Sequence, residues 1–171
     1  TDNMWHESSV LMVVDASALD WLTAGAVPAK SIRVITPHPG EAARLLDATV
    51  AEVQANRVEA LQALSAKFGN CWVVLKGRHT LVGQAEGKVF ANPTGNPALG
   101  QGGSGDLLAG YLAGLLAQSQ LQSQLGQAIL RLGLHTHQNP DIGIDHVRLV
   151  DGGLDVLGTG DLAAGLGQGL R

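Results

Sequence analysis

The sequence predicts one α/β domain spanning residues 1–171, with a central, mostly parallel sheet flanked by helices. Three short and continuously apolar runs, at residues 10–16, 32–37 and 71–77, have the composition of strands buried on both faces. Segments with helical signals separate these runs, and this alternation favours parallel strands joined by crossover helices. A chain of 171 residues, 45% of them apolar, suits a single domain with a buried core.

The first half of the chain carries helix signals between its strands. Ser17 is placed to cap one helix, and a second, short helix is expected directly after the His-Pro-Gly sequence at residues 38–40. Thr49 and Glu52 have the spacing of a capping box, which predicts a longer helix from there. Arg57 and the acidic residues near it are interpreted as an exposed, charged face of that helix.

The second half is expected to begin with a β-hairpin. Residues 80–84 and 88–92 form two apolar stretches around the turn signal Glu86-Gly87. A glycine-rich loop at residues 93–105 comes next. Residues 106–118 then form a predicted helix with almost no polar face, which indicates that it is buried.

Composition narrows the possible partners and compartments. The formal net charge is −4 and no basic stripe is present, so nucleic acid is excluded as an expected partner. No apolar run is long enough to span a bilayer, so no membrane association is expected. A single cysteine, Cys71, excludes an internal disulfide framework and fits a reducing compartment, which predicts a cytoplasmic protein. Its place in an apolar strand indicates packing rather than reactivity.

Three polar features follow the predicted parallel strands. Asp15 ends the first strand, the loop at residues 36–40 follows the second, and Lys76 with Gly77 ends the third. Because ligands of such sheets bind beyond the carboxyl ends of the strands, these features are expected to share one rim and to surround a ligand.

The glycine-rich loop is the most informative stretch of the chain. Gly102, Gly103 and Gly105 allow the backbone to approach a ligand closely. The helix that follows offers unpaired N–H groups and a positive dipole end, which suits an anion such as phosphate. Asp106 falls in the first turn of that helix, where an acid either accepts a proton from a reacting hydroxyl or simply complements the helix dipole. Spacing alone leaves these two interpretations open.

Other motif matches carry less weight. Residues 100–105 satisfy G-x-G-x-x-G, but no strand precedes them and no acidic residue occurs from residue 107 to residue 140, so the dinucleotide fingerprint is not met. Gly-Lys-Ser/Thr is absent. His135 and His137 lack a third ligand of suitable spacing, so no metal site is predicted there. Further helices are expected at residues 125–138 and 160–170.

Four blocks of the sequence resemble segments of the ADP- or ATP-dependent NAD(P)H-hydrate dehydratases and occur in the order of that family: VVDASALDWL, VITPHPGEAARLL, VVLKGRHTLV and TGNPALGQGGSGDLLAG. The last block is commonly TGNPGMATGGSGDVLTG in the family, so this chain departs at residues 98–101 and keeps Gly-Gly-Ser-Gly-Asp whole. The similarity covers residues 10–118 and fades after His135.

The resemblance implies roles for individual residues. Asp106 corresponds to the catalytic acid–base residue, which contacts the hydrated nicotinamide and activates its hydroxyl toward the terminal phosphate of the nucleotide. Gly105 and the amides around it would hold the transferred phosphoryl group. His38 corresponds to a residue that binds the hydrated cofactor, although a turn histidine bonded to the backbone is the alternative.

The same resemblance assigns the nucleotide to the third strand end. Its binding residues would be Lys76, Gly77, Arg78, His79 and Thr80, of which the two at positions 78 and 79 are variable in the family. Asp15 is expected either to help a magnesium ion or bound water, or to cap the helix after it. No residue is assigned as a direct metal ligand.

The family is ribokinase-like, with a three-layer αβα fold, and it restores NADH and NADPH from their hydrates with ADP or ATP and Mg²⁺. The resemblance further implies a homo-oligomer, with fusion to or pairing with an NAD(P)H-hydrate epimerase. The family's opening strand and helix region has no counterpart before residue 10, so we expect the chain to be a fragment. A vitamin or sugar kinase of the same superfamily is the first alternative function, and a non-catalytic nucleotide-binding fragment is the second.

Overall fold

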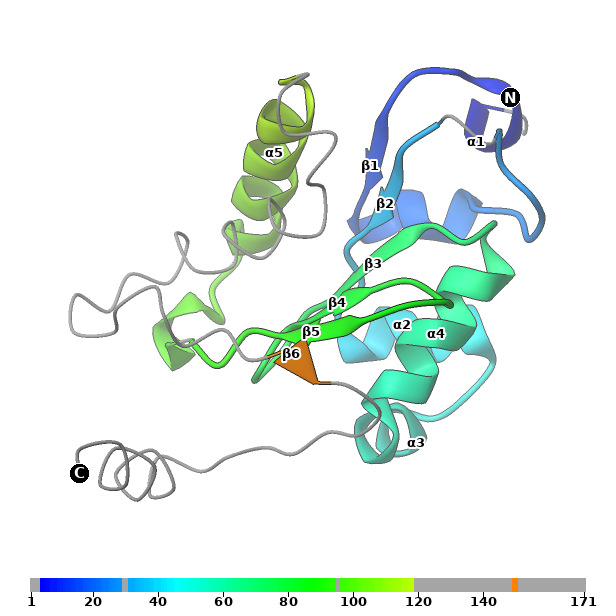
Figure 1. The fold of residues 1–171 in the computed structure, drawn as a ribbon. Helices are drawn as coiled ribbons and strands as arrows, with labels where there is room; N and C mark the ends of the chain where they lie inside the picture. The colour runs from blue at the N-terminus through cyan, green and yellow to red at the C-terminus, as the bar shows by residue number, and fades with distance from the viewer. Residues whose placement is uncertain (1–3, 29–30, 95, 119–148, 151–171) are drawn as a thin grey trace, which may run out of the picture.

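The computed structural model describes residues 4–28, 31–94, 96–118 and 149–150. Its helical elements are α1 (Met4–Glu7), the 3₁₀ helix η1 (Ala16–Trp21), α2 (Pro39–Leu46), α3 (Val50–Ala55), α4 (Arg57–Lys67), the 3₁₀ helix η2 (Pro97–Leu99) and α5 (Ser104–Leu116). These helices surround one central sheet, with α5 on one side and α2, α3 and α4 on the other (Figure 1).

The sheet is mixed and follows the chain order from one edge to the other. Its strands are β1 (Met12–Val14), β2 (Arg33–Ile35), β3 (Trp72–Leu75), β4 (Leu81–Gly83), β5 (Val89–Ala91) and β6 (Leu149–Val150). The first three strands are parallel, with Val13 opposite Val34 and Ile35 opposite Val73. From β3 onward the pairing is antiparallel. The predicted hairpin is therefore confirmed as β4 and β5, and it continues the parallel part of the sheet.

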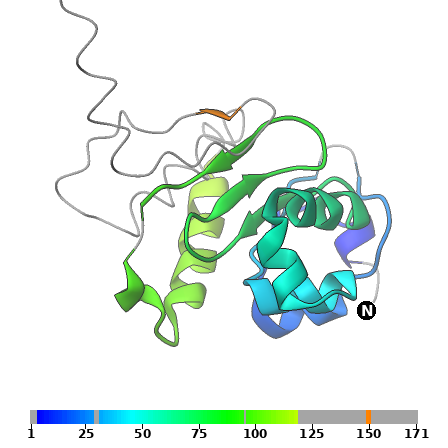
Figure 2. The ribbon, with the colours of Figure 1, turned by 90° about the horizontal axis from the view of Figure 1, so that it is seen from below.

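Helices cover both faces of the sheet. On one face α2, α3 and α4 pack over a core that includes Ile35, Leu61 and Phe68. On the other face α5 contributes Leu112 and Leu116 to a second, smaller core with the opposite-facing strand residues. Figure 2 shows the strands lying between these two layers. The predicted α/β class with helices on both faces is confirmed.

Two local expectations are corrected by the structure. The helix after the first strand is a 3₁₀ helix that starts at Ala16, a residue with a φ of 52°, rather than an α-helix capped by Ser17. The long helix predicted from Thr49 is divided at Asn56, whose φ of −132° and ψ of 61° interrupt the helical path. Both changes depend on single backbone conformations, which apolar periodicity does not reveal.

The helix α5 is less buried than its apolar sequence predicts. Among the described residues, only Leu112 and Leu116 of this helix are fully buried, whereas Leu107 is 75% exposed and Tyr111 is 42% exposed. The helix contacts the sheet along one side, so its other side faces solvent (Figure 1). The helices expected at residues 125–138 and 160–170, with His135 and His137, lie outside the described residues. In the described part of the chain, none of the helices has the length and apolarity that crossing a bilayer requires.

Candidate functional site

The predicted rim at the carboxyl ends of the parallel strands exists. Asp15 follows β1, Thr36 follows β2 and Lys76 follows β3. Backbone hydrogen bonds continue the ladder past the strand ends, because the Thr36 amide donates to the Val14 carbonyl at 3.1 Å and the Lys76 amide donates to the Pro37 carbonyl at 2.8 Å. The three strand ends are thus held next to one another, as the sequence predicts.

An ion-pair cluster occupies the centre of this rim. The Lys76 Nζ atom lies 2.7 Å from Asp15 Oδ1 and 3.8 Å from Glu41 Oε2. The side chains are 19%, 11% and 8% exposed for Lys76, Asp15 and Glu41, so the charges are largely removed from water. Hydrogen-bonded ion pairs with this little exposure fix side-chain positions, because separating them leaves a poorly solvated charge.

The electrostatics of Asp15 favour its charged form. Burial raises the pKa of the Asp15 carboxyl, but hydrogen bonds from Lys76 and Thr36 and the charge of Lys76 outweigh burial and hold the pKa below its ordinary value. Asp15 therefore stays ionised at neutral pH and keeps Lys76 in place. Of its two expected roles, the cap of the following helix is not made by its side chain, because no side-chain cap hydrogen bond is present at η1.

His38 begins the helix α2 and is tied to its own turn. Its Nδ1 atom accepts hydrogen bonds from the amides of Gly40 at 3.0 Å and Glu41 at 3.3 Å. An accepting Nδ1 places the ring proton on Nε2, which lies 3.3 Å from Glu41 Oε1. The side chain remains 52% exposed, and its Nε2 atom makes only this one contact with Glu41 among the described residues. The histidine is both a backbone cap and an accessible donor.

The start of the helix α5 closes the rim from the other face of the sheet. A Cβ atom at Gly105 would lie 3.2 Å from Asp15 Oδ2 and 3.5 Å from Lys76 Nζ, so the backbone of this helix start lies directly against the ion pair and a larger residue would crowd the Asp15 carboxylate. Gly103 caps the helix with a φ of 88°. Asp106 is the acidic residue of the first turn and is exposed to solvent. The start of α5 at Gly105 therefore lies against the Asp15–Lys76 pair, and Asp106 is the next residue of that helix.

The loop after β3 presents the remaining predicted residues. Gly77 has a φ of 131° and His79 a φ of 55°, conformations that turn the backbone sharply. The Thr80 hydroxyl donates to the Gly77 carbonyl at 3.1 Å and closes the turn. Lys76 to Thr80 thus form one compact loop directly beside the ion-pair cluster, although the Lys76 ammonium is already paired with carboxylates.

Two participating residues were not assigned from the sequence. Glu41 links Lys76 to His38, and its Oε2 atom also accepts a hydrogen bond from the backbone amide of His38 at 2.7 Å. The signal is present, because Glu41 stands three residues after the cap residue, which is the capping-box spacing. Arg57, expected on an exposed face, instead turns inward, and its Nη2 atom donates to the Leu75 carbonyl at 3.1 Å.

The charged groups do not form an all-protein metal cage. In residues 4–28, 31–94, 96–118 and 149–150, no three His, Cys, Asp or Glu side chains converge as metal ligands. Mg²⁺ in nucleotide sites usually needs only one or two carboxylates together with phosphates and water. Asp15 Oδ2, which does not bond Lys76, is a carboxylate oxygen of the kind that this lesser requirement calls for.

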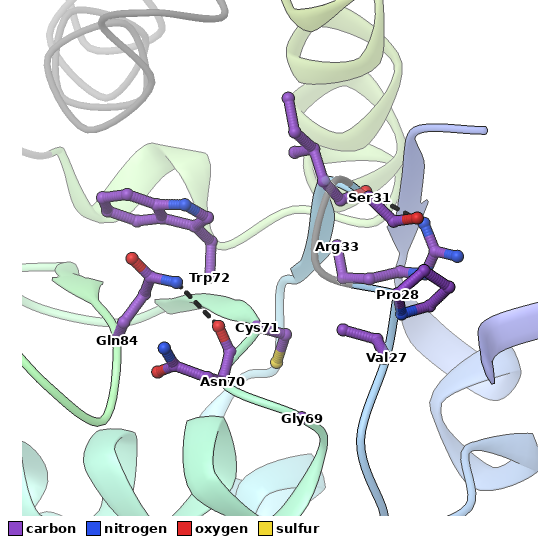
Figure 3. A pocket seen from close by; sticks show the side chains of 10 residues that line it. Val27, Pro28, Ser31, Arg33, Gly69, Asn70, Cys71, Trp72 and Gln84 are labelled. Atoms are coloured by element: carbon purple, nitrogen blue, oxygen red, sulfur yellow. Dashed lines mark hydrogen bonds between the residues drawn. The ribbon is translucent and has the colours of Figure 1, made fainter. Parts of the chain in front are cut away.

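A cavity of about 390 Å³ lies at the opposite ends of the parallel strands (Figure 3). Its polar lining is already paired, since the Gln84 amide donates to the Asn70 carbonyl at 2.6 Å and the Arg33 guanidinium donates to backbone carbonyls, including that of Trp5 at 2.8 Å. Cys71 also lines it, and burial raises the pKa of this thiol to about 12, which confirms a packing role.

A comparison of the sequence with family profiles decides the family. The profile of the NAD(P)H-hydrate dehydratases matches residues 1–142. The chain belongs to this family. It is 46% identical over 112 residues to the ADP-dependent (S)-NAD(P)H-hydrate dehydratase of Neisseria meningitidis serogroup B, covering 63% of this chain and 38% of that protein. It is 44% identical over 112 residues to the bifunctional NAD(P)H-hydrate repair enzyme of Moorella thermoacetica, covering 62% of this chain and 20% of that protein.

Solved structures agree with the NAD(P)H-hydrate dehydratase assignment. A crystal structure of the ADP/ATP-dependent NAD(P)H-hydrate dehydratase of Bacillus subtilis, co-crystallised with ATP and Mg²⁺, has a TM-score of 0.62 at 32% identity, covering 74% of this chain and 45% of that chain. A ribokinase-like superfamily protein of Enterococcus faecalis has a TM-score of 0.57 at 25% identity, covering 77% of this chain and 56% of that chain. The ribokinase-like fold is confirmed, and the chain spans less than half the length of the two bacterial relatives named above.

Proposed function

We propose that the protein containing this chain dehydrates the hydrates of NADH and NADPH in a reaction that consumes ADP or ATP. The observation that carries the proposal is the convergence of the Gly105–Asp106 helix start with the Asp15–Lys76 pair at one rim. The relatives named for this activity and the family match support it. Family membership alone does not say where the reaction would take place, whereas the rim contains a candidate residue for each step of the reaction.

The reaction needs a poor leaving group to become a good one. Asp106 takes the proton of the ring hydroxyl, whose oxygen then attacks the terminal phosphorus of the nucleotide. The bond from that phosphorus to its bridging oxygen breaks, which releases AMP from ADP or ADP from ATP. The phosphorylated ring then loses inorganic phosphate, together with a proton from the neighbouring carbon, and the dihydronicotinamide is restored.

The chain's own residues would orient and stabilise these steps. The free amides at the start of α5, around Gly105, face the rim and suit the oxygens of the transferred phosphoryl group. Residues 76–80 would bind the nucleotide, and the exposed Nε2–H group of His38 would bind the hydrated cofactor. Mg²⁺, when bound with the nucleotide, would neutralise phosphate charge, and Asp15 would supply its protein oxygen.

The partners and the location are part of the same proposal. Pairing or fusion with an epimerase is supported by bifunctional NAD(P)H-hydrate repair enzymes among the relatives. A homo-oligomer is supported by the exposed apolar residues Leu107 and Tyr111 on α5. A cytoplasmic location is supported by the unpaired Cys71, which fits a reducing compartment.

The experiment that tests the proposal is a substrate comparison on the full-length protein. Hydrated NADH, Mg²⁺ and either ADP or ATP are supplied, and recovery of NADH absorbance is followed. In parallel, a panel of vitamins and sugars is supplied with ATP, and phosphorylated product is measured. We expect repair of the hydrate and no sustained phosphorylation of the panel. Phosphorylation without repair would replace the dehydratase by a kinase, and binding of nucleotide without either activity would identify a non-catalytic protein.

A further inference from the structure

Arg57, the first residue of α4, collects the backbone carbonyls of the loop after β3. Its Nη2 atom donates to the carbonyls of Leu75 at 3.1 Å and Lys76 at 3.3 Å, and its Nη1 atom donates to the carbonyl of Arg78. A planar guanidinium is suited to several acceptors at once because its N–H groups point in fixed directions. One side chain therefore sets the direction of three peptide units in this loop.

The direction of these carbonyls determines where the loop amides point. In a trans peptide the N–H group points away from the C=O group of the same unit. The unit that begins at Leu75 shows this, since its carbonyl bonds Arg57 while the Lys76 amide bonds Pro37 on the rim. By the same geometry, the amides of Gly77 and His79 point away from Arg57. Neither amide has a hydrogen-bond partner within the described part of the chain.

Arg57 also places a positive charge behind the loop, with no carboxylate partner in the described part of the chain. Among the described residues, no Asp or Glu oxygen lies within 4.0 Å of its guanidinium. Its Nε atom is buried and has no partner. Lys76, by contrast, is balanced by Asp15 and Glu41. Burial lowers the pKa of Arg57, as expected for a charge held out of water.

We propose that Arg57 is a positioning residue that presets the loop at residues 76–79 to bind the phosphates of the nucleotide. It turns the amides of Gly77 and His79 outward as a pair of donors and adds a fixed positive field behind them. Successive outward amides of this kind form an anion-binding concavity. Arg57 does not touch the nucleotide, since its Nη1 and Nη2 atoms donate to loop carbonyls and its Nε atom is buried. The proposal rests on the proposed function, because it assumes that this loop receives the nucleotide.

Calorimetry on the full-length protein tests the role of Arg57. The variants are Arg57→Ala, Arg57→Lys and, as a matched control, Arg44→Ala, which removes an exposed arginine paired with Asp20 at 3.1 Å. Arg57→Ala should weaken ADP binding about tenfold or more, the scale of losing charge-assisted hydrogen bonds. Arg57→Lys should restore little of the lost ADP affinity, because one ammonium group does not replace the several fixed N–H donors of a guanidinium. Arg44→Ala should bind ADP like the unmodified protein.

Two further readouts separate positioning from general damage. The KM for the nucleotide should rise in Arg57→Ala while the KM for the hydrated cofactor stays the same. Adenosine binding should change less than ADP binding, because the preset amides act on phosphate. Arg57→Lys keeps the test valid should Arg57→Ala fail to fold.

The possible failures are distinguishable. An unmodified protein that does not bind ADP or ATP contradicts the proposed function itself. An unmodified protein that binds ADP, together with an Arg57→Lys variant of unchanged ADP affinity and KM, overturns the role of Arg57. Equal losses for ADP, adenosine and hydrate also overturn it, because they indicate a purely structural residue.

Discussion

Replacing Lys76 by methionine removes the cation of the rim while keeping a side chain of similar length. The change leaves the Asp15 and Glu41 carboxylates, whose side chains are 11% and 8% exposed, without the ammonium group that both of them contact. Loss of one partner costs about 3–5 kcal/mol for a fully buried pair but about 0–1 kcal/mol for an exposed one. Because this pair is mostly buried and its Nζ–Oδ1 distance is 2.7 Å, we expect Lys76→Met to lower the free energy of unfolding at neutral pH by about 2–3 kcal/mol.

The pH dependence of this loss has a definite sign. In the unmodified protein the folded-state pKa of Asp15 is below its ordinary value of 3.8, so the pair contributes stability above about pH 4 and loses it as the pH falls through the folded pKa. In Lys76→Met, burial of Asp15 acts without its main opposing partner, so the pKa of Asp15 rises. The difference in unfolding free energy between the two proteins should therefore be largest near neutral pH and shrink below about pH 4.

Urea unfolding of both proteins at neutral and at acidic pH provides the measurement. The control is Arg44→Met, which removes an arginine paired with Asp20 where the side chains are 55% and 52% exposed. This exposed pair should contribute less than about 1 kcal/mol at either pH. A Lys76→Met variant as mild as the control, or a loss that does not shrink in acid, would refute the account of the rim as a mostly buried ion-pair cluster.

Three other predictions concern the site and the chain. Asp106→Asn should lower turnover by about a hundredfold or more while nucleotide affinity persists, as loss of an acid–base group predicts; unchanged turnover would leave Asp106 as a dipole-complementing charge only. Lys76→Ala should weaken ADP or ATP binding more than hydrate binding, and His38→Ala should do the reverse; calorimetry giving the opposite pattern would place the two ligands on the wrong sides of the rim. Residues 1–171 expressed alone should aggregate or self-associate and show little repair activity. The reason is that β1 pairs on one edge only among the described residues and that α5 exposes Leu107. An active monomer in size-exclusion chromatography would contradict this prediction.

Much of the scaffold follows from the sequence because buried parallel strands leave a continuous apolar signal. The runs ending at Asp15, Thr36 and Lys76 predicted both the strands and the rim that their carboxyl ends share. The glycine-rich loop before Asp106 predicted the helix start that faces this rim. In each case a short run of residues carries the signal. An apolar run marks a buried strand, and the residue after it marks the strand's carboxyl end.

Other features depend on contacts between distant segments and leave little local trace. The inward turn of Arg57 depends on the carbonyls of a loop 18 to 21 residues later in the chain, so its charge alone suggests an exposed helix face. The exposure of Leu107 depends on which segments pack against α5, so its apolarity is not informative. The break at Asn56 is a single backbone conformation within an otherwise helical pattern.

The central claim is that this rim couples hydrate dehydration to phosphoryl transfer, and the yield of two products tests it directly. The full-length protein is given a limiting amount of hydrated NADH with excess ADP or ATP and Mg²⁺, and the NADH recovered and the inorganic phosphate released are both measured at completion. Coupled transfer and elimination predict equal amounts of the two products, and no conversion in Asp106→Asn over the same time. NADH recovered without phosphate, or phosphate released without NADH, would contradict the account.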